Sequence, residues 1–389
     1  MISNLAQSMV KASDSFTLIA LPFFMLIGSL MEKSKIADDL IDFAESIVGR
    51  FTGGLGMTTI VASMLFAAIS GSGIAEVAAI GAVMVPLMVK KGYDRGYSSA
   101  LVAASATMGP TIPPGITLII YGVTVGVSIT ALFTAAIIPG ILMGVSLILY
   151  NYFISKKRDY KGTSKPFSVK AILKDMYTAK WALFLPVLVL GGIYAGFFTP
   201  TEASVVGAVY ALIVGSIIYK NIDMKTLKLC LTDSALLSAT IMFLLGGATI
   251  LGRLFSLEKI PENISEAILS LSDNAILIMI MINVILLIAG MFLDPTSSII
   301  LLAPIFLPIV VDLGYDPVFF GVIMIINLCI GLLTPPVGMN LFVAQSIGEV
   351  SFENLTVRVF PMIILLIILL IIFIIFPQII MFLPNLLNH

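Results

Sequence analysis

Side chains with hard oxygen ligands gather at four places in this sequence, and each place interrupts a long apolar segment. Two interruptions are short, Ser70-Gly71-Ser72-Gly73 and Asp294-Pro295-Thr296-Ser297-Ser298. Two are rich in proline, Gly109-Pro110-Thr111-Ile112-Pro113-Pro114-Gly115 and Thr334-Pro335-Pro336-Val337-Gly338-Met339-Asn340. Proline removes a backbone donor and glycine adds backbone freedom, so each run frees carbonyl and amide groups that lipid cannot satisfy. Freed carbonyls and hydroxyls suit a small alkali cation, while the N-termini of half-helices attract a carboxylate.

One carboxylate lies directly at an interruption, and the energetic cost of placing its charge inside a membrane predicts a bound ion. Asp294 is that carboxylate. A charged side chain inside a membrane costs several kcal/mol unless it is paired, and a bound sodium ion would meet that cost. The other candidate oxygens belong to hydroxyls and one amide: Ser70, Ser72, Thr107 and Thr111 in the first half, and Thr296, Ser297, Thr334 and Asn340 in the second.

Three further polar residues each allow more than one interpretation. Glu76 either lines the cation site, caps a helix or pairs at the base of a hairpin. Glu202 follows a proline-containing turn, which favours a helix-start acid over a ligand. Asn327 either joins two helices or takes part in the site. The two cysteines, Cys230 and Cys329, are far apart in the sequence, which favours buried or lipid-facing thiols.

The composition identifies a polytopic membrane protein. Of 389 residues, 59% are hydrophobic and 11% are charged, against about one-quarter charged in a soluble domain. The mean hydropathy is +1.12. The formal net charge is −1 and the only histidine is His389, so we expect neither nucleic-acid binding nor histidine-based catalysis. An intramembrane hydrolase using Asp294 or Ser72 would need a nearby base, and the sequence has no HExxH or G-x-S-x-G motif.

The elements that must position these residues are helices of membrane-spanning length. Apolar segments near the roughly 20 residues of a spanning helix predict crossings at 16–31, 128–153, 181–198, 202–219, 234–255 and 361–383. Segments 56–90 and 275–311 are interrupted at their centres and predict hairpins, whereas 96–126 and 317–346 are broken by prolines. Charged and apolar residues alternate at helical spacing at 35–50, 165–180, 223–233 and 260–272, which predicts helices in the membrane interface.

An internal repeat relates the two hairpins. Six residues recur 222 positions later: Pro86, Gly92, Tyr93, Asp94, Pro113 and Pro114 match Pro308, Gly314, Tyr315, Asp316, Pro335 and Pro336. The same offset places Ser72 on Asp294. If each hairpin enters and leaves on one side, an odd number of crossings separates the units, which predicts the inverted repeat of secondary transporters. This arrangement puts 18 of the 21 basic residues on one side, which the positive-inside rule makes cytoplasmic.

Five ordered motifs resemble the large membrane subunit of tripartite ATP-independent periplasmic (TRAP) transporters. They are SGSGIAEVAAIGAVMVPLM, GPTIPPGI, GIYAGFFTPTEASVVGAVYALIVG, LDPTSSIILLAPIFLPI and LLTPPVGMNLFVAQ, and the resemblance runs over nearly the whole chain. It implies sodium-driven uptake of an organic acid, commonly a sialic acid or a C4-dicarboxylate. It also implies two protein partners, a small membrane subunit with four helices and a soluble periplasmic substrate-binding protein.

The resemblance further implies where the ions and the cargo bind. In the family, the hairpin tips and the opposing helix breaks form the sodium sites. The sodium-site residues expected here on that basis are Ser70, Gly71, Ser72, Gly73, Gly109, Thr111, Pro113, Asp294, Thr296, Ser297, Thr334, Pro335, Gly338 and Asn340. The cargo is expected between the tips, near Ser72, Thr111, Pro114, Thr296, Ser298 and Pro336.

The chain departs from the family pattern in two places. Members usually carry aspartate where this chain has Glu76. They also usually have about one further hydrophobic helix before the segment that matches Met1 to Ser15. We therefore expect this sequence to start late and to lack part of the scaffold rather than the transport site.

The sequence thus predicts an all-α, polytopic transporter of the bacterial inner membrane, with an inverted repeat, two re-entrant hairpins and two broken helices. We expect an elevator mechanism, no enzymatic activity and no cofactor, with sodium as the coupling ion. The predicted units are 1–55 (scaffold helix and interfacial arm), 56–126 (first transport unit), 127–255 (scaffold), 256–346 (interfacial arm and second transport unit) and 347–389 (C-terminal scaffold helix). The alternative within this class is a stand-alone sodium/dicarboxylate symporter without a binding protein.

Overall fold

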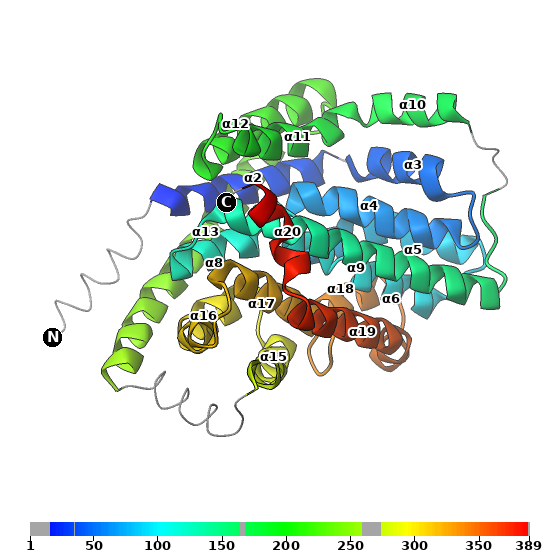
Figure 1. The fold of residues 1–389 in the computed structure, drawn as a ribbon. Coiled ribbons are helices and arrows are strands. Elements are labelled where there is room, and N and C mark those ends of the chain that lie inside the picture. The colour runs from blue at the N-terminus through cyan, green and yellow to red at the C-terminus, as the bar shows by residue number, and fades with distance from the viewer. Residues whose placement is uncertain (1–15, 35, 164–167, 259–273, 388–389) are drawn as a thin grey trace.

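The computed structural model describes residues 16–34, 36–163, 168–258 and 274–387, and all regular structure within these ranges is helical (Figure 1). Among the described residues, eight helices are long and apolar enough to cross a membrane. Two further pairs of helices, each bent at a short break, raise that number to ten if each pair is one span. The predicted all-α, polytopic class is therefore confirmed.

The first repeat unit is a helical hairpin followed by a broken helix. The hairpin pairs α4 (Gly54–Ser70) with α5 (Gly73–Lys90). The broken helix consists of α6 (Arg95–Ser105), α7 (Met108–Thr111) and α8 (Ile116–Val125), with a bend of 41° at the break. Its prolines lack amide hydrogens, so the ladder of helical hydrogen bonds stops where the sequence predicts the break.

The second repeat unit has the same order of elements. Its hairpin pairs α15 (Ala275–Phe292) with α16 (Pro295–Asp312). Its broken helix consists of α17 (Pro317–Gly331) and α18 (Met339–Gly348), separated by the predicted proline-containing run. Both hairpins and both breaks therefore lie where the sequence predicts them.

The second arms of the two hairpins begin in the same way, as the repeat predicts. Ser72 accepts a hydrogen bond from Ala75 N at 3.5 Å and caps α5. Asp294, at the matching position, accepts one from Ser297 N at 3.0 Å and caps α16. Further matched features are the helix caps Asp94 and Asp316, the positive φ angles of Gly92 (88°) and Gly314 (85°), and the cis bonds Pro113–Pro114 and Pro335–Pro336.

A separate group of helices packs around α2 (Ala20–Lys33). α2 contacts α12 (Pro200–Ile213) and α13 (Met224–Leu257), and α11 (Lys180–Tyr194) packs against α12. A five-residue π-helix, Val214–Ile218, extends α12. In the view of Figure 1, α11 and α12 lie along the top of the molecule and α15 and α16 along the bottom.

Two amphipathic helices match predicted interfacial segments, and one prediction of this kind is wrong. α3 (Ile36–Val48) packs against α4 and against α10 (Val169–Thr178). Residues 223–233, predicted as a separate interfacial helix, instead form the start of α13, because no breaker separates them from the apolar segment that follows. The predicted helix at 260–272 lies outside the described residues.

The last predicted crossing, 361–383, is also corrected. The helix there is α19 (Phe352–Ile375), which starts earlier and ends before Pro377. Pro377 and the turn around it lead into a separate short helix, α20 (Gln378–Leu387). The apolar run of sequence is continuous across this point, so hydropathy alone joined two helices that the proline separates.

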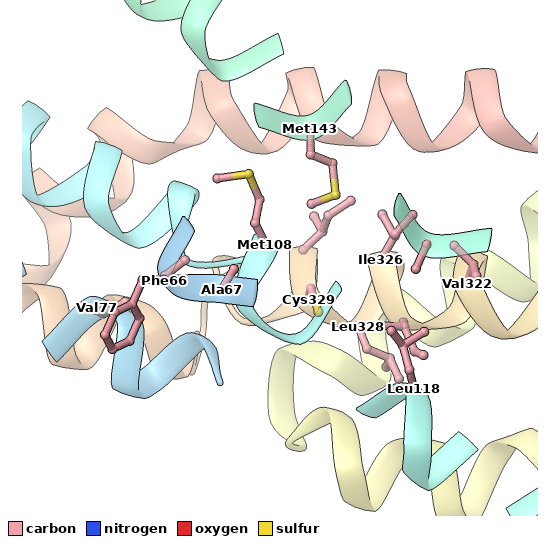
Figure 2. Close-up of a cluster of buried hydrophobic side chains, with 14 of the residues drawn as sticks. Phe66, Ala67, Val77, Met108, Leu118, Met143, Val322, Ile326, Leu328 and Cys329 are labelled. Carbon is pink, nitrogen blue, oxygen red and sulfur yellow. The ribbon is translucent and has the colours of Figure 1, made fainter. Parts of the chain in front are cut away.

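The last long helices run beside the repeat units. α9 (Ile129–Lys157) packs against α4, α17 and α20, and α19 packs against α6 and α17. A shared hydrophobic core results (Figure 2). The side chains labelled in Figure 2 come from both repeat units and from α9: Phe66, Ala67, Val77, Met108, Leu118, Met143, Val322, Ile326, Leu328 and Cys329.

Candidate functional site

The tips of the two hairpins face one cavity of about 380 Å³. Both helix breaks also contribute to its wall, through Pro110 and Thr117 in the first unit and Leu332 and Met339 in the second. The tip residues that line it are Gly71, Ser72, Gly73 and Ile74 from the first hairpin and Asp294, Pro295, Thr296 and Ser297 from the second. The four interruptions of the sequence therefore meet in space.

The first tip needs glycine at position 71 for two reasons. Gly71 ends α4 in the left-handed conformation, with φ at 61°, which side chains disfavour. A Cβ atom at this position would also lie 2.9 Å from the carbonyl oxygen of Pro114. The tip of the hairpin is therefore in direct contact with the break of the neighbouring helix.

A fully buried carboxylate lies behind the first tip. Glu76, in the first turn of α5, has no exposed surface; the hydroxyl of Ser63 in α4 lies close to its carboxylate, but no well-aligned hydrogen bond to a described residue forms. A Cβ atom on Gly109 would lie 2.8 Å from Glu76 Oε2 and 2.9 Å from Gly73 N, so the carboxylate lies against both the break and the tip. Burying a carboxylate without a partner is costly, and a small cation at this place would remove that cost.

Asn340 lies at the first tip rather than at the second. It follows the second helix break, yet its amide Nδ2 donates to the carbonyl of Ala103 at 3.4 Å and its Oδ1 is buried without a hydrogen-bond partner among the described residues. A Cβ atom on Gly73 would lie 3.3 Å from both atoms of that amide and 2.7 Å from the carbonyl oxygen of Ala106. An oxygen from the second unit and a carboxylate from the first therefore approach the same glycine.

This crossing has a structural cause that acts in both units. The helix after the second break, α18, packs against the hairpin arm α5 and against α6 of the first unit. The helix after the first break, α8, packs in turn against the hairpin arm α16 of the second unit. Each hairpin therefore contacts the broken helix of both units.

Asp294 at the second tip is already hydrogen-bonded. Its carboxylate accepts from Ser297 N at 3.0 Å and from Ser297 Oγ at 2.5 Å, and the side chain is only half-buried. One turn further along α16, Ser298 is fully buried and its hydroxyl has no partner among the described residues. The charge at the second tip therefore needs a bound ion less than Glu76 does.

The threonines at the breaks keep oxygen atoms available. Thr111 Oγ1 donates to the carbonyl of Thr107 at 3.1 Å, and Thr334 Oγ1 donates to that of Ile330 at 2.8 Å. Each hydroxyl can still accept through its lone pairs. The donors at the breaks are hydroxyl and carbonyl oxygens, which are hard ligands. Among the described residues no group of three or more histidine, cysteine, aspartate and glutamate side chains could hold a metal.

The cavity wall agrees with only part of the predicted cargo site. Ser72 and Thr296 line the cavity, whereas Thr111, Pro114, Ser298 and Pro336 are not among its lining residues. Sequence reasoning missed five lining residues on two helices outside the repeat: Met25 of α2, and Leu237, Thr240, Ile241 and Leu244 of α13. Only Thr240, a hydroxyl in an apolar helix, gave a signal in the sequence.

Two of the three polar residues left open by the sequence, Glu202 and Asn327, have structural roles. Glu202 forms a capping box with Thr199 at the start of α12, which confirms the predicted helix-start acid. Asn327 Nδ2 donates to Asn283 Oδ1 at 2.7 Å and to its carbonyl oxygen at 2.8 Å, and so joins α17 to α15. Neither residue belongs to the cavity wall.

Comparison with known proteins gives consistent matches over the chain. The profile described as "Tripartite ATP-independent periplasmic transporter, DctM component" matches residues 1–379. The sialic acid TRAP transporter large permease protein SiaM of Vibrio cholerae is 38% identical over 385 residues, which cover 99% of this chain and 90% of that protein. The C4-dicarboxylate TRAP transporter large permease protein DctM of Pseudomonas aeruginosa is 36% identical over 387 residues, covering 100% and 90%.

A longer relative and a solved structure complete the comparison. The isethionate TRAP transporter permease protein DctMQ of Oleidesulfovibrio alaskensis is 42% identical over 381 residues. The matched region covers 98% of this chain but only 60% of that protein. The crystal structure of the YdaH transporter of Alcanivorax borkumensis superposes with a TM-score of 0.66 at 14% identity, covering 96% of this chain and 87% of the other. That likeness shows a shared fold.

Proposed function

The chain belongs to the DctM family of TRAP transporter large permeases, and from this membership we propose that it couples sodium entry to the import of an organic acid. Members of this family are multi-pass proteins of the bacterial inner membrane and are transporters rather than enzymes. One observation supports this proposal most directly. Two hairpin tips and two helix breaks line a single cavity, and directly behind it lies a buried carboxylate with no well-aligned hydrogen bond to any residue that the structure describes.

The first sodium ion is assigned to the space between Glu76, Gly109 and Gly73. Glu76 supplies the charge, and Asn340 Oδ1 is a neutral oxygen that also lacks a partner among the described residues. Both groups approach Gly73, so an ion bound here would connect the tip of the first hairpin to α18 of the second unit. The second ion is assigned to the tip with Asp294, Thr296 and Ser297, near the break that contains Thr334.

The cargo is assigned to the cavity between the tips. The helices α5 and α16 both begin at its wall, at Gly73 and Pro295, and helix N-termini carry partial positive charge. Two such ends facing one cavity suit a carboxylate, without a basic side chain at the tips. The printed names of the relatives speak of sialic acid, C4-dicarboxylates and isethionate, which share a negative charge.

The proposed motion is an elevator movement of the hairpin units past α2 and α13. A Cβ atom on Gly28 of α2 would lie 3.0 Å from the carbonyl oxygen of Ser70, so α2 passes very close to the first tip. We place α9 and α19 with the moving unit, although 127–255 and 347–389 were predicted as scaffold, because both helices pack against the repeat units. The fixed part would then be the group around α2.

The predicted partners follow from the family in the same way. We propose that a small membrane subunit completes the scaffold and that a soluble periplasmic protein delivers the cargo. We also propose that both hairpins are re-entrant, because their tips meet at one cavity.

The test is uptake into proteoliposomes that contain this chain and its small membrane subunit. Radiolabelled succinate and N-acetylneuraminate are presented by the periplasmic protein, with and without an inward sodium gradient. Uptake that requires both the gradient and the binding protein would support the proposal. Uptake by this chain alone would support the stand-alone symporter, and uptake independent of sodium would refute sodium coupling.

A further inference from the structure

A second cavity, of about 470 Å³, adjoins the first. It lies between the C-terminal end of α2, the N-terminal half of α13 and the first hairpin tip. Ser72 and Leu237 line both cavities, so the two spaces meet at the first tip. We call the second cavity the vestibule, and it leads from the proposed cargo site toward the side predicted to be cytoplasmic.

The vestibule contains charged side chains, unlike most of the cavity between the tips. Among the described residues in its wall, Lys33 at the end of α2 is the one basic side chain, and Glu32 and Asp233 are the acidic ones. Lys33 Nζ lies 3.1 Å from Glu32 Oε1, with 40% of the Lys33 side chain and 29% of the Glu32 side chain exposed. An exposed pair of this kind contributes little to stability, so the lysine can exchange its partner for another carboxylate at little cost.

We propose that the vestibule is a second, transient anion site, and that Lys33 receives the carboxylate of the cargo after it leaves the hairpin tips. This inference rests on the proposed function, because it assumes an anionic cargo released on this side. The hydroxyls of Ser29, Ser70 and Ser234 lie in the same wall and can donate to the carboxylate. Asp233, on the opposite helix, gives the vestibule an acidic group toward which a departing sodium ion is drawn.

The contribution of Lys33 to the entry of anions into the vestibule can be measured without knowing the cargo. In the assembled membrane complex in nanodiscs, Ser29→Cys places a thiol in the vestibule wall. The readout is the ratio of its modification rates by an anionic and a cationic methanethiosulfonate. The parent complex gives the background, because Cys230 and Cys329 of this chain are both buried.

We expect Lys33→Gln to lower the anionic-to-cationic ratio by roughly fivefold or more, since a single charge in a cleft changes encounter rates with charged reagents. Lys33→Arg should restore the ratio. Lys91→Gln is the matched control, because Lys91 is exposed at the end of α5 and is not in the vestibule wall. In sodium-driven uptake, Lys33→Gln should lower the maximal rate without changing the concentration of loaded binding protein that gives half of it.

An unchanged ratio in Lys33→Gln would overturn the anion site even if uptake by the wild-type protein is driven by sodium. A fall in the ratio that Lys91→Gln reproduces equally would also overturn it, because the effect would then be one of general surface charge. Absence of sodium-driven uptake in the wild-type protein would instead count against the proposed function. The labelling ratio and the uptake measurement therefore fail separately.

Discussion

Replacing Glu76 with glutamine tests the proposed first ion site most sharply. The substitution keeps the size and shape of the side chain and removes only its charge. Both carboxylate oxygens are buried, and the described polar side chain close to them is that of Ser63, whose hydroxyl can bond to an amide as well as to a carboxylate. Its effects should therefore report the charge alone, which makes it a cleaner test than a truncation to alanine.

The expected loss of sodium affinity follows from the electrostatics of the site. Two unit charges about 4 Å apart attract each other by about 4 kcal/mol at an effective dielectric constant of about 20. The amide oxygen of glutamine remains a neutral ligand for the ion and offsets part of this attraction, which leaves a net loss of about 2–3 kcal/mol when the charge is removed. Sodium should therefore bind the Glu76→Gln variant roughly 30- to 150-fold more weakly than the wild-type protein.

The same substitution should have the opposite effect on stability when sodium is absent. Without the ion, the wild-type protein buries an unpaired carboxylate, whereas the variant buries a neutral amide, which costs less. The purified permease should consequently unfold at a higher temperature as Glu76→Gln in sodium-free buffer and at a lower temperature than wild type in saturating sodium. Such a crossing of the two melting curves requires that the ion and the carboxylate interact.

The assay is thermal unfolding of the purified permease over a series of sodium concentrations, with uptake measured over the same series. Glu202→Gln is the control, because Glu202 is a carboxylate that caps α12 away from the cavity. Parallel sodium dependence in wild type and Glu76→Gln, with no crossing, would refute the assignment of sodium to Glu76. Equal effects in Glu202→Gln would show that the melting temperature reports something other than the site.

Three further predictions use the same assays. Gly109→Ala should lower sodium-driven uptake by about tenfold or more, because its Cβ atom would lie 2.8 Å from Glu76 Oε2 and 2.9 Å from Gly73 N; normal uptake would show that the break yields easily. Asp294→Asn should still fold, because asparagine also caps helices, and should weaken sodium dependence less than Glu76→Gln does; an equal or larger loss would assign the greater ion-binding role to Asp294. Gly28→Val should slow uptake while leaving sodium affinity near wild type, because its side chain blocks the close approach of α2 to Ser70. Gly191→Val, whose Cβ has open space, should leave the uptake rate unchanged; equal uptake rates in the two variants would contradict sliding at the contact between α2 and Ser70.

The hairpins and breaks were predictable because local chemistry determines them. Pro110, Pro113 and Pro114 interrupt backbone hydrogen bonds wherever they occur, and Ser72 and Asp294 cap the helices that follow them. The 222-residue offset then carried each assignment from one half of the chain to the other.

Tertiary contacts decide what the sequence left open. Asn340 was predicted with the second tip because it follows the second break, but α18 crosses to the first unit and carries Asn340 to Gly73. The burial of Glu76 was open for the same reason, since it depends on Gly109 and on the packing of α4 and α6 around it. The part of the cavity wall that α2 and α13 form has no signature in the local sequence, because an apolar helix has a similar sequence whether it faces lipid or a cavity.

The repeat divides its acidic residues in a way that bears on how the proposed sodium ions and cargo would be coupled. The offset matches Ser72 with Asp294 and Glu76 with Ser298, so each unit has one acid and one hydroxyl at these two positions, in exchanged order. In the second unit the acid is at the tip, is held by Ser297 and faces the cavity; in the first it is one turn deeper and has no partner among the described residues. The deeper site therefore has more to gain from a cation and should fill first. Because Asn340 of the second unit lies at that site, an ion there would tie both units together before the cargo arrives. Coupling would then follow from the order of binding. Sodium would bind first and fix the distance between the two hairpin tips, and the anion would bind between the tips afterwards.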